Sequence, residues 1–319
     1  MIKVGIIGGA GYTAGELVRI LIHHPDVEIV QVVSSSQAGK KLYEIHHDLV
    51  GSTELEFVEQ LSHEVDIVYL CQGHGRSKKY LTENLLPEGV NVIDLSQDFR
   101  HQSNTQFNNR EFIFGLPEVN KATISEATAV ANPGCFATAI MLGLLPLAKN
   151  ELLNEVHIHA LTGSTGAGQG FSATSHFSYR HSNVSIYKPF EHQHLVEIRE
   201  TLGTGAMLNF IPIRGAFTRG IFASMYLETN ASLTSIQKLY QDFYAHAVFT
   251  HLSDHPVHLK QVVNTNNCIL HVEKVEDKLL IISVIDNLLK GASGQAVQNM
   301  NLMYGLDEST GLKLKGSFF

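Results

Sequence analysis

The chain opens with a strand, a glycine-rich turn and a helix in immediate succession, and this start constrains the fold more than any other feature. Ile2 to Gly8 is a short apolar run, typical of a strand buried on both faces of a parallel sheet. After the turn, Thr13 to His24 has the spacing of an amphipathic helix, which Pro25 ends. Further strands are expected over residues 27–33, 65–70, 90–95 and 127–131. This alternation predicts an α/β fold with an N-terminal doubly wound parallel (Rossmann) sheet.

The pattern changes after about residue 150. Extended runs cover residues 156–161, 207–213, 218–227, 268–275 and 279–285, and helices are expected over 194–202 and 234–246. The second helix begins with a possible capping box, Thr234 to Gln237. We therefore expect a second α+β domain on a mixed or antiparallel sheet over residues 136–290. Residues 1–135 form the first domain, and a helix with an apolar stripe in residues 291–319 returns to complete it.

Composition excludes several classes of partner. The net charge of −8 and the lack of interleaved basic and aromatic runs argue against nucleic acid. The best apolar run, Ala139 to Ala148, is too short to span a membrane. The three cysteines are irregularly spaced, which fits no disulfide framework and favours a reducing, cytoplasmic location. Despite eighteen histidines, we expect no metal, since no His-x-x-x-His pair lies beside a carboxylate within a helical pattern.

The glycine turn has the features of a dinucleotide site. Gly8 would make the tight turn, and Gly11 would let the backbone approach a pyrophosphate at the helix N-terminus. Tyr12 and Thr13 open the helix, and Ala14 is small enough for close helix–strand packing. A polar turn follows the second strand, with no acidic residue to bind ribose hydroxyls. Its hydroxyls and lysine suit a 2′-phosphate, which favours NADP(H): Ser34, Ser35, Ser36 and Lys40.

Cys135 is the candidate nucleophile. It follows Asn132-Pro-Gly and precedes an apolar helical run, so it falls in the first turn of a helix. Unpaired backbone N–H groups and the positive end of the helix dipole stabilise a thiolate there. Cys71 and Cys268 have the setting of buried structural cysteines.

Five stretches resemble the N-acetyl-γ-glutamyl-phosphate reductases of arginine biosynthesis: residues 8–17, 92–100, 115–118, 131–135 and 286–299. The resemblance runs in order from residue 4 to about 312, and the aspartate-semialdehyde dehydrogenases are more distant relatives. The chain departs from the family pattern at two places. The family often has a histidine within the stretch that corresponds to Phe210 to Ile213, and it has serine in place of Thr165.

The resemblance implies a reaction and its residues. Cys135 would attack an N-acyl-γ-glutamyl phosphate to give a thioester, which NADPH reduces to the semialdehyde. His192 would be the acid and base, supported by His194 and Glu197. Since Cys135 is the last residue of the first domain, we expect Cys135 and His192 to come from different domains. Further residues expected to bind are Arg100, Asn132 and Thr165 for the substrate and its phosphate, and Asn287 for the cofactor.

Several points stay open at this level. The acyl group could be acetyl or a larger acyl such as succinyl. We expect a homodimer or homotetramer, because the second domain is large and extended. Alternative functions are an aspartate-semialdehyde dehydrogenase and a non-catalytic NADP-binding redox sensor that uses Cys135.

Overall fold

A computed structural model describes residues 1–62 and 64–318 of the chain. It separates into two compact units, each described here by itself. Unit 1 comprises Met1–Pro133 and Ala292–Lys313, and unit 2 comprises Gly134–Gly291 and Leu314–Phe319. The first boundary lies two residues before the expected one, so Cys135 belongs to unit 2, together with His192. The end of the chain also differs from the expected return over residues 291–319, because the Ser317 N–H donates to Val263 O in unit 2 (3.0 Å).

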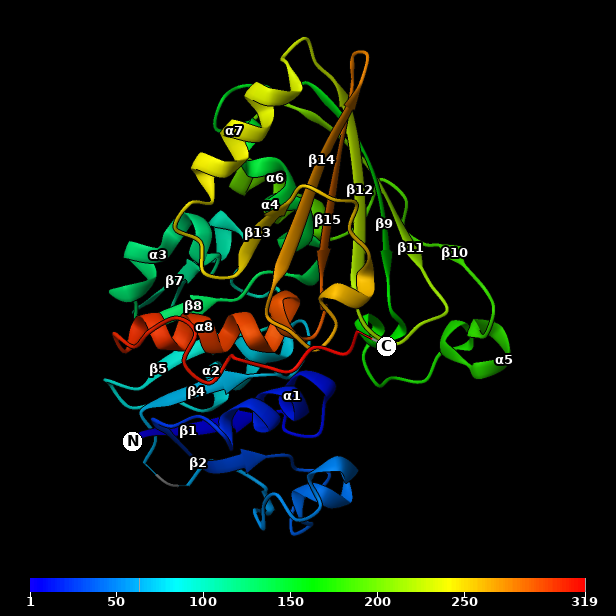
Figure 1. The fold of residues 1–319 in the computed structure, drawn as a ribbon. Coiled ribbons are helices and arrows are strands. Elements are labelled where there is room, and N and C mark those ends of the chain that lie inside the picture. Colours follow the sequence, from blue (N-terminus) through cyan, green and yellow to red (C-terminus); the bar gives the residue numbers. More distant parts are fainter. Residues whose placement is uncertain (63, 319) are drawn as a thin grey trace. The chain divides into compact units, whose positions relative to one another are not determined.

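Unit 1 is built on an eight-stranded sheet with the order β3-β2-β1-β4-β5-β8-β7-β6 (Figure 1). Its strands are β1 (Ile2–Ile7), β2 (Val27–Val33), β3 (Phe57–Val58), β4 (Ile67–Leu70), β5 (Asn91–Asp94), β6 (Gln106–Phe107), β7 (Arg110–Phe114) and β8 (Ala129–Ala131). Neighbouring strands are parallel, except that β6 is antiparallel to β7. The helices are α1 (Tyr12–Leu21), α2 (Arg76–Glu83), α3 (Pro117–Ser125) and α8 (Gly294–Met303). The order reverses at β1, so the glycine turn lies at the switch point where such sheets bind ligands.

Helix α8 belongs to unit 1 and packs against α1 and α3. The Asn299 amide donates to Gly115 O and to the side-chain oxygen of Asn132 (both 3.0 Å), and the Ser293 hydroxyl donates to Thr13 O (2.8 Å). Ser293 and Asn299, from the second half of the last sequence motif, are thus buried hydrogen-bonding partners within this unit. The buried apolar residues of α8 are Ala296, Val297, Met300 and Leu302.

Unit 2 is built on a seven-stranded mixed sheet with the order β10-β11-β9-β12-β15-β14-β13. Its strands are β9 (Glu155–Thr162), β10 (Ser185–Ile186), β11 (Met207–Arg214), β12 (Ile221–Glu228), β13 (Thr250–Ser253), β14 (Cys268–Val275) and β15 (Lys278–Ile285). Only the β11–β9 and β13–β14 pairs are parallel. The helices are α4 (Cys135–Ala148), α5 (Phe177–Arg180), α6 (His194–Leu202) and α7 (Leu233–Phe243). Both predicted sheet types are confirmed.

Helix α4 is the buried centre of unit 2 and packs against β12, β14, β15, α6 and α7. Pro146 lies inside it and has no N–H for Leu142 O, which instead accepts the Tyr244 hydroxyl (2.5 Å). Gly143 lets the sheet approach closely, because a Cβ there would lie 2.3 Å from the Met225 methyl carbon. These contacts fix α4, and with it the residue at its start.

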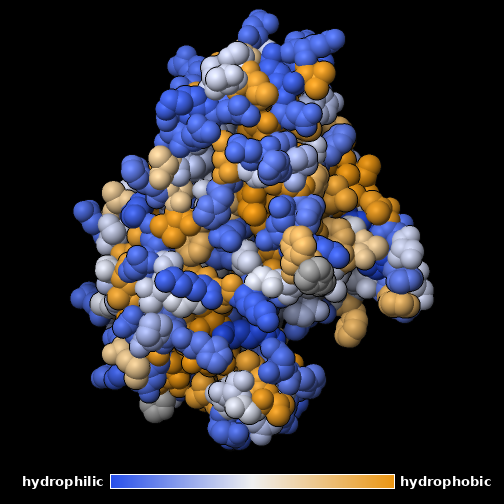
Figure 2. All heavy atoms as spheres, in the orientation of Figure 1, coloured by the Kyte–Doolittle hydropathy of each residue, from blue (hydrophilic) through white to orange (hydrophobic). Residues whose placement is uncertain are grey.

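The opposite face of the seven-stranded sheet carries none of the helices α4, α6 and α7 (Figure 1). Alternate side chains of β9, β11 and β12 point to this face, as the alternating burial along these strands shows. Figure 2 shows apolar side chains gathered over this part of unit 2. The open face includes His157, His159, Met207, Ile211 and Tyr226.

Some elements differ from the sequence predictions. The N-cap of α7 is Ser232, whose hydroxyl accepts from the Ser235 N–H (3.2 Å), so the capping box expected at Thr234 is wrong. A π-helical turn, Leu289–Ser293, precedes α8. The strands β3, β6, β7, β10 and β13 and the helices α3 and α5 were not predicted. Among the described residues, no helix is long and apolar enough to cross a membrane.

Candidate active site

The glycine turn of unit 1 is shaped to bring backbone close to a ligand. Gly8 has a φ of +84°, and a Cβ there would lie 3.0 Å from the Cys71 backbone. Gly11 is the N-cap of α1, and neither a side-chain cap nor an acidic residue occupies the first turn. The first N–H groups of α1 are therefore available to an anion such as a pyrophosphate. Ala14 is fully buried and Tyr12 is exposed, as close helix packing and a cofactor-facing start require.

The turn after β2 presents the residues expected to bind a 2′-phosphate. Ser34 is buried, whereas Ser35, Ser36 and Lys40 are exposed. The Gln37 N–H donates to Ser34 O (3.1 Å), and the Lys40 ammonium donates to the Gln37 side chain (3.0 Å). These bonds close the turn and hold the Lys40 ammonium at the Gln37 side chain, whose amide donates to the Ser36 hydroxyl (3.5 Å).

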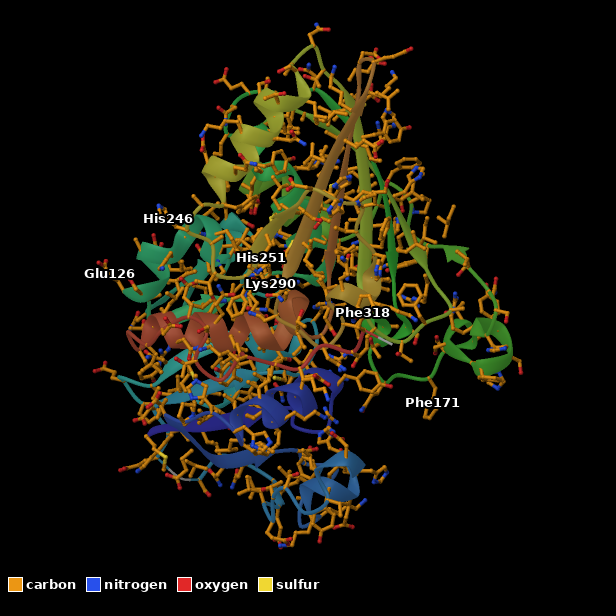
Figure 3. The ribbon with its side chains drawn as sticks, in the orientation of Figure 1. Glu126, Phe171, His246, His251, Lys290 and Phe318 are labelled. Atoms are coloured by element: carbon orange, nitrogen blue, oxygen red, sulfur yellow. The ribbon has the colours of Figure 1, made fainter. Side chains whose placement is uncertain are left out.

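In unit 2, Cys135 is the first residue of α4, as predicted, and it is half-buried. Its N-cap is Gly134, which has no side chain to cap the helix, and no acidic residue lies in the first turn. The π-helical turn packs closely against Cys135, because a Cβ on Gly291 would lie 2.8 Å from the Cys135 Cβ. Lys290 of the same turn is fully buried (Figure 3). π-Helical turns are frequent at functional sites.

His192 lies beside the start of α4 in the same unit. Its ring meets Phe136 and Phe210 edge-on at 5.4 Å between ring centroids in each case. Nδ1 accepts the backbone N–H of His194 (3.2 Å), so in the neutral ring Nε2 carries the proton. Burial, and after it the positive charges of Lys188 and Arg214, lower the pKa of His192 to about 4. The imidazole is therefore neutral at pH 7 and presents an N–H donor.

His194 and Glu197 lie against the residue that precedes the nucleophile. Both are buried, and His194 Nε2 lies 3.9 Å from Glu197 Oε1. The other carboxylate oxygen of Glu197 accepts the Gly134 N–H (3.1 Å). The structure thus joins Cys135, His192, His194 and Glu197 in one unit.

The two residues of unit 1 that were expected to bind phosphate both form hydrogen bonds with neighbouring protein groups. Arg100 is buried and donates to Asn132 O and Leu95 O (both 2.8 Å). The Asn132 side chain donates to Ala292 O (3.1 Å) and accepts from Asn299 (3.0 Å). These contacts fix the end of β8 just before the nucleophile segment.

Thr165 and Asn287 meet in unit 2. The Asn287 amide donates to the Thr165 hydroxyl (3.0 Å), which donates in turn to Thr218 O (2.6 Å). Asn287 Oδ1 accepts the Gly220 N–H (2.6 Å). Asn287 was expected to contact the cofactor, and the structure places it in this hydrogen-bonded group.

Sequence reasoning missed Tyr187 and Arg214. The Arg214 guanidinium lies 4.5 Å from the centre of the Tyr187 ring, and its buried Nε has no hydrogen-bond partner among residues 1–62 and 64–318. The Tyr187 ring lies 5.8 Å from that of His192. Burial and the negative charge of Cys135 raise the pKa of Tyr187 to about 12, although Arg214 opposes this. The available signal was an arginine directly after a predicted strand, where the chain departs from the pattern of the family that it resembles.

The other cysteines have surroundings unlike those of Cys135. Burial raises the pKa of Cys71, and Cys268 is fully buried in β14 beside the Ser283 hydroxyl (3.5 Å). Neither location favours a thiolate. Within residues 1–62 and 64–318, no group of three or more histidine, cysteine or acidic residues could hold a metal ion.

Comparisons with known proteins agree with this arrangement. Residues 3–127 match the semialdehyde dehydrogenase NAD-binding domain, and residues 135–287 match the semialdehyde dehydrogenase dimerisation domain. The chain is 56% identical to an N-acetyl-gamma-glutamyl-phosphate reductase of Christiangramia forsetii and 54% identical to that of Phocaeicola vulgatus, over the full length of each chain.

Solved structures share the fold at low sequence identity. Aspartate semialdehyde dehydrogenase II of Vibrio cholerae, in complex with ASA, gives a TM-score of 0.75 at 17% identity, covering 96% of this chain and 98% of the other. The Candida albicans aspartate semialdehyde dehydrogenase with NADP gives 0.70 at 13% identity, covering 95% and 99%.

Proposed function

Since the chain belongs to the N-acetyl-γ-glutamyl-phosphate reductases of arginine biosynthesis, we propose that Cys135 and His192 carry out this reduction with NADPH as the cofactor. The observation that carries the proposal is the nucleophile at the start of α4 with a neutral, buried histidine beside it in the same unit. The family identity supplies the substrate, N-acetyl-γ-glutamyl phosphate, and its semialdehyde product.

The first step uses the Cys135 thiolate. It attacks the γ-carbonyl carbon, and phosphate leaves with the electron pair of the broken C–O bond, giving a thioester. The start of α4 favours the thiolate, because it has no acidic residue or side-chain cap in its first turn. The backbone N–H groups there could also stabilise the oxyanion of the tetrahedral intermediate.

The second step reduces the thioester, and the bound nicotinamide supplies the hydride. His192 Nε2–H donates to the oxygen that becomes negative, and the proton returns when the thiohemiacetal collapses to the semialdehyde and the thiolate. Tyr187 stays protonated at neutral pH and lies beside this ring. His194 and Glu197 support the nucleophile segment.

Substrate binding needs cations, because the substrate carries a carboxylate and a phosphate. Arg214, whose Nε has no hydrogen-bond partner in the described part of the chain, is the side chain that we propose for one of these anions. Arg100 and Asn132 would act on the substrate's phosphate by fixing the segment that follows β8. Thr165, the third candidate for substrate binding, lies in the turn after β9.

The residues of unit 1 fit NADP(H). Gly8, Gly11, Tyr12, Thr13 and Ala14 would hold the pyrophosphate and the start of α1 around it. The 2′-phosphate would be bound by Ser34, Ser35, Ser36 and Lys40, with no acidic side chain among them to repel it.

We further propose that two copies pair through the open face of the seven-stranded sheet. This face is partly apolar and belongs to the segment that matches a dimerisation domain. A homodimer, or a homotetramer built from two of them, follows. A reactive thiol at Cys135 suits the reducing conditions of the cytoplasm.

The test is the reverse reaction, phosphate-dependent reduction of NADP, measured with N-acetylglutamate semialdehyde and with aspartate semialdehyde. We expect turnover with the first aldehyde. Cys135→Ser should lower turnover by at least ~10³ and leave NADP binding intact. Cys268→Ser is the matched control and should keep its turnover. Full activity of Cys135→Ser would refute the covalent mechanism, and preference for aspartate semialdehyde would refute the substrate.

A further inference from the structure

The start of the nucleophile helix lacks a cap of its own. An N-cap usually carries a side-chain acceptor, and the third helical residue often carries a glutamate that accepts the N–H of the N-cap residue. In α4 these positions are Gly134 and Ala137, neither of which can accept. Glycine is also the residue with the greatest backbone freedom. No side chain of these two positions of α4 can therefore hold the N–H of Gly134, the residue to which Cys135 is attached.

A carboxylate from another helix accepts the N–H of Gly134 instead. Glu197 of α6 is only 2% exposed, and its Oε2 accepts the Gly134 N–H at 3.1 Å. On the other side of the same residue, Gly134 O accepts the backbone N–H and the hydroxyl of Thr138 (2.8 and 3.1 Å). Both backbone polar groups of Gly134 are thus held, one by α6 and one by α4.

The fit around Gly134 is close. A Cβ there would lie 2.4 Å from His194 Nε2 and 2.7 Å from Glu197 Oε1. An ordinary N-cap residue such as serine or aspartate is therefore excluded by the same pair that supplies the substitute acceptor. His194 Nε2 lies 3.9 Å from Glu197 Oε1, so the imidazole packs beside the carboxylate.

We propose that Glu197 is a positioning residue for Cys135, because its buried carboxylate fixes the N-cap of the nucleophile helix through the Gly134 N–H, with His194 packed beside it. This role differs from the orientation of the catalytic ring, since His192 Nδ1 is held by the backbone N–H of His194. The inference rests on the proposed function of Cys135. The arrangement also leaves the first N–H groups of α4 for the substrate, because Gly134 has no side chain that could accept from them.

Two substitutions at one position test this role. Glu197→Gln keeps an oxygen that can accept the Gly134 N–H, whereas Glu197→Met has similar volume and no such acceptor. The control is Glu200→Met, one turn further along α6. For each purified full-length variant, kcat, KM, NADPH affinity and the rate of Cys135 alkylation by iodoacetamide from pH 6 to 9 are measured.

We expect Glu197→Met to lower kcat and the alkylation rate at pH 7 by about 30-fold, with less than about threefold change in KM and NADPH affinity. Its alkylation profile should shift to higher pH. In Glu197→Gln, both kcat and the alkylation rate should be at least about tenfold higher than in Glu197→Met. Glu200→Met should match the unmodified protein in both. Should Glu197→Met fail to fold, Gly134→Ala is used, which leaves the carboxylate and displaces it from the N-cap; we expect the same loss of alkylation rate.

Unchanged alkylation in Glu197→Met or Gly134→Ala would overturn the proposal. So would an equal loss in Glu197→Gln, because the charge would then matter and not the acceptor. Alkylation needs no turnover, so this result is separate from a failure of the proposed reaction, which would show as an inactive unmodified protein.

Discussion

His192 should make the protein less stable in mild acid, by an amount that follows from its surroundings. Its pKa is lowered from 6.5 to about 4 in the folded protein, chiefly by burial and then by Lys188 and Arg214. Above pH 6.5 the ring is neutral in both the folded and the unfolded chain, and it adds no pH dependence. As the pH falls below 6.5, the unfolded chain binds a proton that the folded protein resists. Stability is therefore lost between pH 6.5 and about 4.

At pH 5 the binding of this proton by the unfolded chain lowers the free energy of unfolding by about 2 kcal/mol, as calculated from the two pKa values. The perturbation is His192→Asn, which cannot titrate. Urea unfolding at pH 7.5 and pH 5 gives the pH-dependent loss for each protein, and the loss should be about 2 kcal/mol smaller in the variant. Comparing the losses removes the contribution of other histidines and of lost packing against Phe136 and Phe210. An equal loss in both proteins would refute a buried, neutral His192.

Three further predictions concern the cofactor, the substrate and the fold. NADP(H) should bind at least about tenfold more tightly than NAD(H), and Lys40→Ala should narrow this ratio, as fluorescence titration with both cofactors would show. Arg214→Met should raise the KM for the acyl phosphate about tenfold or more, whereas Arg199→Met on the exposed side of α6 should not. Asp286→Asn should lower the free energy of unfolding by about 3 kcal/mol in urea titrations, because it removes a buried carboxylate that accepts from Arg219 at 3.0 and 3.2 Å.

The parts of the fold with strong local patterns could be predicted from the sequence. β1, β2 and α6 follow the expected residues closely, because their apolar spacing and glycine or proline ends are local signals. β3, β6 and β10 have two residues each and exist because a neighbouring strand offers an edge, which no local window records. α7 begins at Leu233, one residue before the predicted start, and its N-cap is Ser232, an error typical of helix ends.

In the site too, the features that depend on local sequence could be predicted and those that depend on tertiary contacts could not. Cys135 at a helix start is a local feature of Asn-Pro-Gly-Cys before an apolar run, and the structure confirms its position. The contact between Glu197 and Gly134 joins residues 63 positions apart. Arg214 beside Tyr187 depends on the return of β10 along β11. Such contacts are set by tertiary packing, so the sequence alone could name the histidine motif but not what each of its members holds.

The cations near His192 lead to a last prediction, on the pH dependence of catalysis. Lys188 and Arg214 lower the pKa of His192 in the free protein, after the larger effect of burial. An anionic substrate bound beside them offsets their charge, so the imidazolium becomes less unfavourable and the pKa of His192 rises. The acid limb of kcat/KM reports the free protein and that of kcat reports the complex. The limb of kcat should therefore lie at higher pH than that of kcat/KM, and Arg214→Met should bring the two together. If the acid limbs of kcat and kcat/KM coincide in the unmodified protein, the charge of the bound substrate does not change the pKa of His192.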